Sequence, residues 1–167
     1  MSRGFVKEDD QEEAPIIPPR AALPKGVENY ITPFGYQLLL KEKEELENDQ
    51  KNLPKNNETE HRRASAVIDA KLKLLNERII SAKIITLEKQ PQKEVRFGAV
   101  VTFKKENKTL KFQIVGVDEA DIKKQKIAFT APIAKALTGK KVGDSAKFTL
   151  GKQTQFLEIL KISYPEN

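Results

Sequence analysis

The stretch from residue 32 to 85 constrains the fold most, because its apolar residues recur at helical spacing on both sides of one break. Thr32 followed by Pro33 is typical of a helix start, where a hydroxyl caps the first turn and proline loses no hydrogen bond. Three leucines then follow at seven-residue spacing, namely Leu39, Leu46 and Leu53. This pattern predicts a helix with a narrow apolar stripe, suited to one partner helix.

The partner helix is predicted directly after the break. Pro54 disfavours a helical residue before it, and Asn56 and Asn57 are turn formers. From about Glu58, a 3,4,3,4,3 spacing keeps one set of residues on a single face: Ser65, Ile68, Leu72, Leu75, Ile79 and Ala82. We expect an antiparallel hairpin over residues 30–88 that projects roughly 30 to 40 Å. A finger this narrow buries little core but suits insertion into a partner.

Composition narrows the class of protein without identifying its function. The 167 residues are 38% hydrophobic and 32% charged, with no cysteine and one histidine. The missing cysteines exclude disulfides and thiolate zinc sites, and one histidine leaves no Ser/His/Asp or Cys/His catalytic set. No apolar run could span a bilayer and no apolar signal core begins the chain, so we expect a cytoplasmic protein.

The net charge of +6 is unevenly distributed. Residues 86–167 contain 16 Lys and Arg against 9 Asp and Glu, whereas the hairpin is nearly balanced. A basic surface is typical of proteins that work near DNA or RNA, but lysine-rich surfaces also serve solubility alone. The sequence leaves both interpretations open.

Residues 1–29 have neither a helical nor a strand period. An acidic run over residues 8–13 is followed by a proline-rich stretch from Pro15 to Pro24. This composition predicts a flexible leader that buries no face of its own. The alternative is that Ile16, Ile17 and Leu23 dock on the folded body as a polyproline-like strip.

From residue 95 onward the pattern changes to that of strands. Alternating apolar residues predict five short strands, at 99–103, 110–115, 126–129, 145–150 and 155–163. One short helix is predicted over 131–137, ended by Gly139. We therefore expect a small α+β domain at residues 95–167, in which the helix covers one face of an antiparallel sheet.

Several motifs of this region occur, in the same order, in a known family. They are Phe97-Gly98-Ala99, Phe112-x-Ile114-Val115-Gly116-x-Asp118-Glu119-Ala120-Asp121, Ala131-Pro132-Ile133-Ala134-Lys135-Ala136-Leu137, Gly139-Lys140-Lys141-Val142-Gly143-Asp144 and Ile159-x-x-Ile162-x-Tyr164. Together with the Thr-Pro-x-Gly opening of the hairpin at 32–35, they resemble the bacterial Gre (GreA/GreB) transcription elongation factors. The resemblance covers about residues 30–164.

The resemblance implies an FKBP-like C-terminal domain on the rim of the secondary channel of RNA polymerase, with the coiled coil inserted into that channel. By the same resemblance, the residues facing the rim would be Asp118, Glu119, Ala131, Pro132 and Ile133. Acidic residues at the tip of Gre hairpins help hold a second magnesium ion near the 3′ end of the nascent RNA, which stimulates cleavage of backtracked RNA. The protein itself would have no catalytic residue, cofactor or metal of its own.

The turn of the hairpin is where this sequence departs from that family. The family motif Gly-Asp-Leu-x-Glu-Asn-Ala-Glu-Tyr is absent from residues 52–60, and each arm is about eight residues shorter, or about 12 Å. The carboxylates nearest the turn are Asp49, Glu58 and Glu60. Either they act in the polymerase site, or they belong to a solvated face and a helix start that favours negative charge. His61, beside the turn, is expected to pack or cap.

Three functions remain open on the sequence alone. The first is a Gre-like factor that regulates elongation and stimulates cleavage through its tip. The second is a regulator that occupies the same channel without cleavage, which the short hairpin favours. The third is an FKBP-like prolyl isomerase or chaperone, although the sequence does not suggest the aromatic pocket that such activity needs. The narrow, polar hairpin predicts a monomer.

Overall fold

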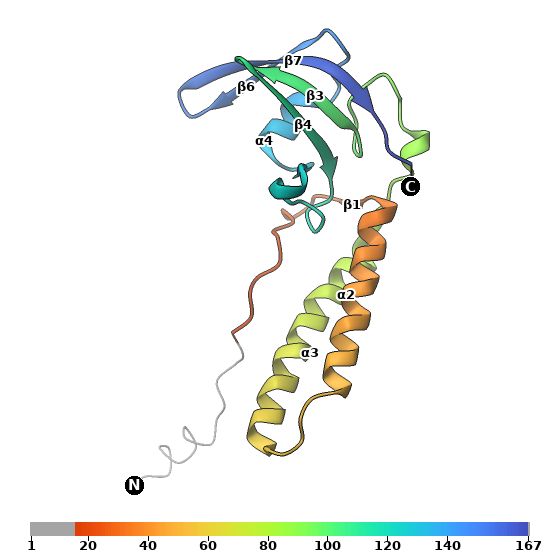
Figure 1. Ribbon diagram of the computed structural model, residues 1–167, viewed down its shortest axis with the longest axis vertical. Helices are drawn as coiled ribbons and strands as arrows, with labels where there is room; N and C mark the ends of the chain where they lie inside the picture. Colours follow the sequence, from red (N-terminus) through yellow and green to blue (C-terminus); the bar gives the residue numbers. More distant parts are fainter. Residues whose placement is uncertain (1–15, 167) are drawn as a thin grey trace.

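The computed structural model describes residues 16–166, so the acidic run of the leader lies outside the described residues. Two helices form a projecting hairpin, and a curled sheet with one short helix lies at its base (Figure 1). This α+β arrangement is the one that the sequence predicts. Within the described residues, no helix is long and apolar enough to cross a membrane.

The hairpin consists of α2 (Pro33–Lys51) and α3 (Glu58–Ser81). Both helices begin with the caps that their sequences suggest. The Thr32 hydroxyl accepts from the Gly35 N–H at 2.9 Å, and the Asn57 side chain accepts from the Glu60 N–H at 3.1 Å. These caps satisfy donors that the first turn of a helix leaves free. At 1.5 Å per residue, α2 extends about 28 Å and α3 about 36 Å.

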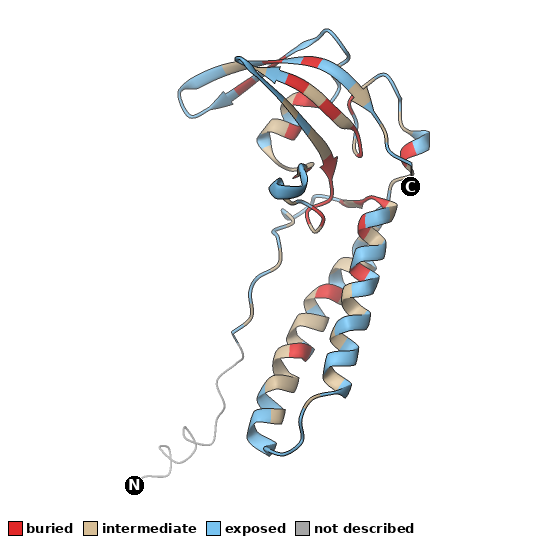
Figure 2. Ribbon diagram, viewed as in Figure 1, coloured by how far each residue is buried: buried red, intermediate tan, exposed pale blue. Residues whose placement is uncertain are grey.

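The seam between the helices is apolar at the base and mixed toward the tip, where Ile68 is buried beside polar side chains. Leu39 and Leu75 are buried together, with Leu46 and Ile79 packed against them. Nearer the turn, Gln50 donates instead to polar side chains of α3, Ser65 at 3.4 Å and Asp69 at 2.5 Å. Burial accordingly decreases toward the tip, which is exposed (Figure 2). The hairpin is held mainly by its base.

The sheet has the strand order β5-β4-β3-β7-β6. Its neighbours pair antiparallel, except that β4 and β5 are parallel, so the expectation of a wholly antiparallel sheet is corrected to a mixed one. The parallel pair forms because the chain after β4 turns back through a loop and the 3-10 helix η2 (Ile122–Lys124) before β5 begins. The strands are β3 (Val100–Lys105), β4 (Lys108–Val115), β5 (Lys126–Ala128), β6 (Ser145–Leu150) and β7 (Gln153–Ser163).

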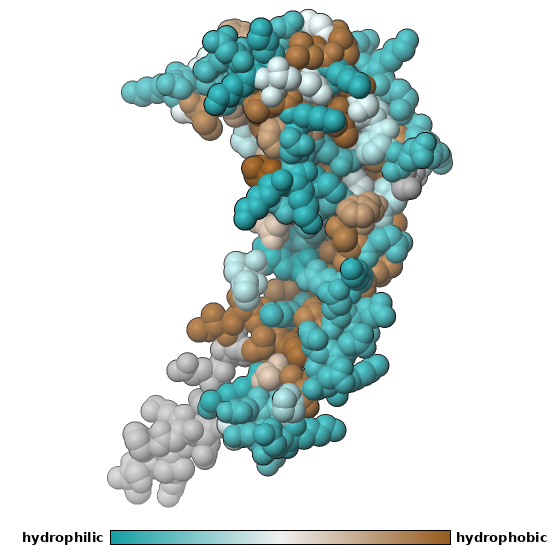
Figure 3. All heavy atoms as spheres, viewed as in Figure 1, coloured by the Kyte–Doolittle hydropathy of each residue, from teal (hydrophilic) through white to brown (hydrophobic). Residues whose placement is uncertain are grey.

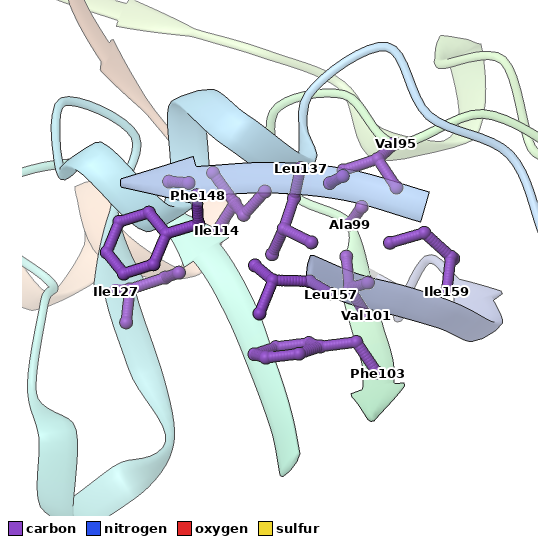
Figure 4. Close-up of a cluster of buried hydrophobic side chains, with 12 residues drawn as sticks. Val95, Ala99, Val101, Phe103, Ile114, Ile127, Leu137, Phe148, Leu157 and Ile159 are labelled. Carbon is purple, nitrogen blue, oxygen red and sulfur yellow. The ribbon is translucent and has the colours of Figure 1, made fainter. Parts of the chain in front are cut away.

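One hydrophobic core joins this sheet to the short helix α4 (Pro132–Leu137). Leu137 and Ala134 of the helix are fully buried against Phe103 and Leu157 of the sheet. Figure 4 shows these strands directing their apolar side chains toward one another and toward α4. The alternating burial of β6 and β7 follows from the period of a strand with one covered face.

The base of the hairpin contains a small sheet that the sequence did not suggest. Strand β1 (Asn29–Ile31) runs parallel to β2 (Ala82–Ile84), which continues directly from α3. The Asn29 side chain also donates to the Arg78 carbonyl at 3.0 Å. A 3-10 helix, η1 (Leu87–Lys89), then leads to the sheet domain. Strands of three residues are too short to show a period, so only the fold reveals them.

Candidate functional site

The tip of the hairpin presents the three candidate carboxylates. Asp49 lies in the last turn of α2, and Glu58 and Glu60 lie in the first turn of α3; all three are exposed. His61 is half-buried beside them, with Nδ1 at 3.1 Å from the Pro54 carbonyl oxygen. This ring therefore supports the turn, as expected.

Two of the tip carboxylates lie at the start of a helix. Glu58 and Glu60 sit at a helix N-terminus, whose dipole favours negative charge. Within the part of the chain that the structure describes, no three acidic, histidine or cysteine side chains are grouped so as to hold a metal ion. A metal at this tip would need further ligands from a partner.

Asp118 lies at the junction between the hairpin and the sheet domain. Its side chain is only 4% exposed and is held by two arginines. Arg20 Nε lies 3.1 Å from Asp118 Oδ1, and Arg78 Nη1 lies 3.0 Å from Asp118 Oδ2. Both oxygens are thus engaged within this chain. The carboxylate points into the junction, and its contact with a polymerase rim stays a prediction.

Glu119 is buried at the same junction. Its Oε1 accepts from the Thr32 hydroxyl at 2.6 Å, and Lys126 Nζ lies 4.0 Å away. Its Oε2 is buried without a hydrogen-bond partner among residues 16–166. The side chain is only 2% exposed within this chain, and the rim contact of Glu119 also stays a prediction.

The other three candidate rim residues lie where α4 begins. Pro132 is exposed, whereas Ala131 and Ile133 are half-buried and pack against the core of the sheet domain. The structure therefore separates the five candidates. Two are internal to the junction, and the exposed one is at the start of α4.

An aromatic pocket near α4 was missed by sequence reasoning. The rings of Tyr30, Phe97 and Phe129 contact one another with centroids 5.5 to 5.9 Å apart. They line a hollow of about 580 Å³, together with Arg96 and Lys135. The three rings come from β1, the start of the sheet domain and the end of β5, so no local spacing could have revealed them. The hollow combines an apolar lining with two cations.

The described part of the leader is docked on the junction. The Arg20 guanidinium donates to both oxygens of Glu42, at 2.8 and 3.1 Å, in addition to its bond with Asp118. The hydrogen bond with Glu42, followed by the charge of Asp118, raises the pKa of Arg20 against the effect of burial. The Ala21 carbonyl accepts from Arg78 Nη2.

The leader is anchored to the folded body by polar contacts of Arg20. Ile16 is almost fully exposed, and Ile17 and Leu23 are half-buried. The alternative interpretation of the leader is right in that it docks on the folded body, but the anchor is Arg20. An arginine in a proline-rich leader gave no signal, because its acidic partners are far away in the sequence.

The sequence of the chain matches known proteins of one family. Residues 90–164 match the family model described as "Transcription elongation factor, GreA/GreB, C-term". The chain is 37% identical over 101 residues to the transcription elongation factor GreA of Hyphomonas neptunium, covering 58% of this chain and 63% of that protein. It is 35% identical over 105 residues to the GreA of Rhodospirillum rubrum, covering 62% of this chain and 67% of that protein.

Solved structures are similar at lower identity. Thermus aquaticus Gfh1 is 22% identical with a TM-score of 0.40, over 81% of this chain and 98% of that chain. A GreA/GreB elongation factor from Nitrosomonas europaea is 21% identical with a TM-score of 0.40, over the same shares. The chain spans 63% of the length of the Hyphomonas relative, which is less than two thirds. From the sequence matches, the chain belongs to the GreA/GreB family of transcription elongation factors.

Proposed function

We propose that this protein binds RNA polymerase and regulates transcription elongation by inserting the α2–α3 hairpin into the secondary channel. The observation that carries the proposal is the projecting hairpin with an exposed, acidic tip, attached to a domain that matches the GreA/GreB model. A hairpin whose seam buries so few side chains contributes little core, so its length is better explained by reach.

The proposal assigns a separate role to each of three parts of the chain. In the proposal, residues 30–88 form the inserting coiled coil, residues 95–167 form the docking domain, and residues 1–29 form a leader. The protein acts as a monomer in the cytoplasm, near the 3′ end of the nascent RNA and the DNA template. It has no catalytic residue or cofactor of its own, and any magnesium ion belongs to the polymerase.

The docking surface is the side of the sheet domain at the start of α4. Pro132 is exposed there, and the aromatic hollow lined by Phe129 and Lys135 lies beside it. An apolar anchor in an aromatic pocket is a common centre of a protein interface. Asp118 and Glu119 contribute indirectly, because they hold the domain against the hairpin.

Whether the tip stimulates RNA cleavage depends on its reach. Asp49, Glu58 and Glu60 are exposed, but a metal shared with the polymerase requires oxygen atoms at about 2.0–2.1 Å. Arms shorter by about 12 Å would leave the carboxylates far from that metal. This length favours a channel-occupying regulator over a cleavage factor.

The test uses a backtracked elongation complex of the polymerase from the same source. Binding and RNA cleavage are measured together for the wild-type chain and for Asp49→Ala, Glu58→Ala and Glu60→Ala. Glu77→Ala is the matched control, since Glu77 is exposed on α3 near the base of the hairpin. Binding without cleavage is the expected result for the regulator.

Other outcomes separate the alternatives. Cleavage that is lost in the tip variants and retained in Glu77→Ala would identify a cleavage factor with an unusual tip. Absence of binding would overturn the proposal. Turnover of a proline peptide by the full chain, lost in Phe129→Ala, would instead support the prolyl isomerase, for which the aromatic hollow is the relevant observation.

A further inference from the structure

We propose that residues 16–25 act as a strap that sets the angle between the α2–α3 hairpin and the sheet domain, with Arg20 as its positioning residue. The angle matters for function because, once the sheet domain is bound to a partner, it determines the direction in which the hairpin points. The strap itself is a property of the free protein. Its consequence for channel entry rests on the proposed function.

The strap is joined to three separate parts of the molecule through one cluster of charges. Arg20 binds Glu42 on α2 with two hydrogen bonds and binds Asp118 in the loop after β4. Arg78 on α3 binds the other oxygen of Asp118 and donates to the Ala21 carbonyl of the strap. Two cations thus face two anions that belong to the hairpin and to the sheet domain.

The burial of this cluster makes it stronger than an ordinary surface ion pair. The side chains of Arg20, Arg78 and Asp118 are 19%, 14% and 4% exposed, whereas that of Glu42 is 41% exposed, so the bonds to Asp118 are the buried part of the cluster. Exposed pairs contribute little to stability, whereas charge-assisted hydrogen bonds in a partly desolvated setting are stronger and fix geometry. Removal of Arg20 would leave Asp118 with one arginine and Glu42 without its bidentate partner.

Because Glu42 lies away from the start of α2, its bond with Arg20 can resist tilting of the hairpin relative to the sheet domain. Of the other hydrogen bonds between hairpin and sheet domain, that of Thr32 with Glu119 lies at the start of α2, and that of Arg78 with Asp118 lies in the last turn of α3. Glu42 lies nine residues beyond Pro33, about 13 Å farther along the helix. A contact at the base of the hairpin keeps the hairpin attached to the sheet domain but permits it to tilt. A contact farther along α2 resists this tilting. Arg20 therefore restrains the angle.

The strap also forms one wall of a hollow on the hairpin. Pro18 and Pro19 lie over a hollow of about 360 Å³ between the two helices and the loop after β4, lined by Leu46, Leu74, Val117 and Ala120. Residues 16–25 follow one side of the hairpin in Figure 1, and hydrophobic atoms gather along that side in Figure 3. Prolines restrict the free segment, which lowers the entropy lost on docking.

The experiment measures the angle directly in the full-length chain. Because the chain has no cysteine, Lys51→Cys near the tip and Lys108→Cys on the sheet domain introduce the only two thiols for spin labels. Pulsed electron resonance then gives the distribution of distances between them. The variants are Arg20→Met, which keeps the apolar stem, and Lys25→Met, an exposed control in the same segment.

We expect one narrow distribution for the unsubstituted leader and for Lys25→Met. Arg20→Met should broaden or shift the distribution, with the docked population falling by about tenfold or more, as expected for lost charged hydrogen bonds. Arg20→Lys should be intermediate, because an ammonium cannot reproduce the planar fork. Should Arg20→Met fail to fold, as judged by helical circular dichroism, Glu42→Gln tests the same contact from the hairpin side.

A distribution for Arg20→Met, or for Glu42→Gln, that equals that of the control would overturn the strap. Polymerase binding by the same variants tests the consequence. A broadened distribution with weaker polymerase binding supports it, and a broadened distribution with unchanged binding overturns it. If the unsubstituted chain does not bind polymerase, the proposed function fails while the distances still decide whether the strap exists.

Discussion

The Thr32 hydroxyl lies 2.6 Å from Glu119 Oε1, so the cap of α2 donates to a buried carboxylate of the sheet domain. The same hydroxyl accepts from the Gly35 N–H. One side chain therefore begins the hairpin and joins it to the sheet domain. The start of the helix and the junction should consequently respond to the same substitution.

Thr32→Val keeps the shape of the side chain but removes both hydrogen bonds. The Gly35 N–H loses its cap, and the buried Glu119 carboxylate loses its hydroxyl donor. We expect the free energy of unfolding in urea to fall by about 2–4 kcal/mol. For Thr32→Ser, which retains the hydroxyl, the free energy of unfolding should fall by less than about 1 kcal/mol. Equal losses in both variants would contradict a role for the hydroxyl.

Gly116→Ala should disturb the junction through the backbone. A Cβ atom at this position would lie 2.5 Å from the Tyr30 carbonyl oxygen, which belongs to β1 and cannot rotate away. We expect a loss of about 1–3 kcal/mol in the free energy of unfolding, with amide shifts in 29–31 and 82–84 on nuclear magnetic resonance. Ala120→Ser, at an exposed site in the same loop, should leave those amides unchanged.

Deprotonation of Tyr164 should lower the free energy of unfolding at alkaline pH. Its hydroxyl donates to the Glu94 carbonyl at 2.6 Å and accepts from the Arg96 N–H at 2.9 Å. Burial raises the pKa of Tyr164 above its usual 10.0, so the folded protein holds this proton more tightly than the unfolded chain. The resulting stabilisation is complete below about pH 10 and is lost as the pH rises through the folded-state pKa.

Tyr164→Phe should remove this pH dependence. At pH 8 the variant should be less stable by about 1 kcal/mol through the lost hydrogen bonds. Between pH 9 and 11, urea unfolding should show a smaller loss of stability than in the wild type. Tyr36→Phe, on the hairpin, should retain the alkaline loss; the same profile in both variants would assign the effect to another group.

Leu75→Ala should destabilise the hairpin near its base. Leu75 is fully buried in the seam beside Leu39, so the truncation leaves a cavity. We expect a loss of about 2–5 kcal/mol in the free energy of unfolding, measured from the helical circular dichroism signal. Ile80→Ala is the matched control on the same helix, because Ile80 is 84% exposed. A comparable loss at Ile80 would show that the seam is not where the hairpin is held.

The sequence by itself determined the elements whose signals are local. The cap at Thr32 sets the start of α2, and α3 begins at Glu58, both as predicted. Strand β6 has the predicted bounds, and buried and exposed residues alternate over its first five positions. Such features depend on residues within one or two turns of each other, so a period or a capping residue is sufficient to find them.

Only the tertiary structure decided which residues meet at the junction. Arg20 and Asp118 are 98 residues apart, and the aromatic rings around Tyr30 come from three distant segments. Asp118 and Glu119 look like surface carboxylates in a charged loop, yet the fold buries them against the hairpin. Contacts of this kind arise from the docking of complete elements, and no spacing along the chain encodes where those elements come together.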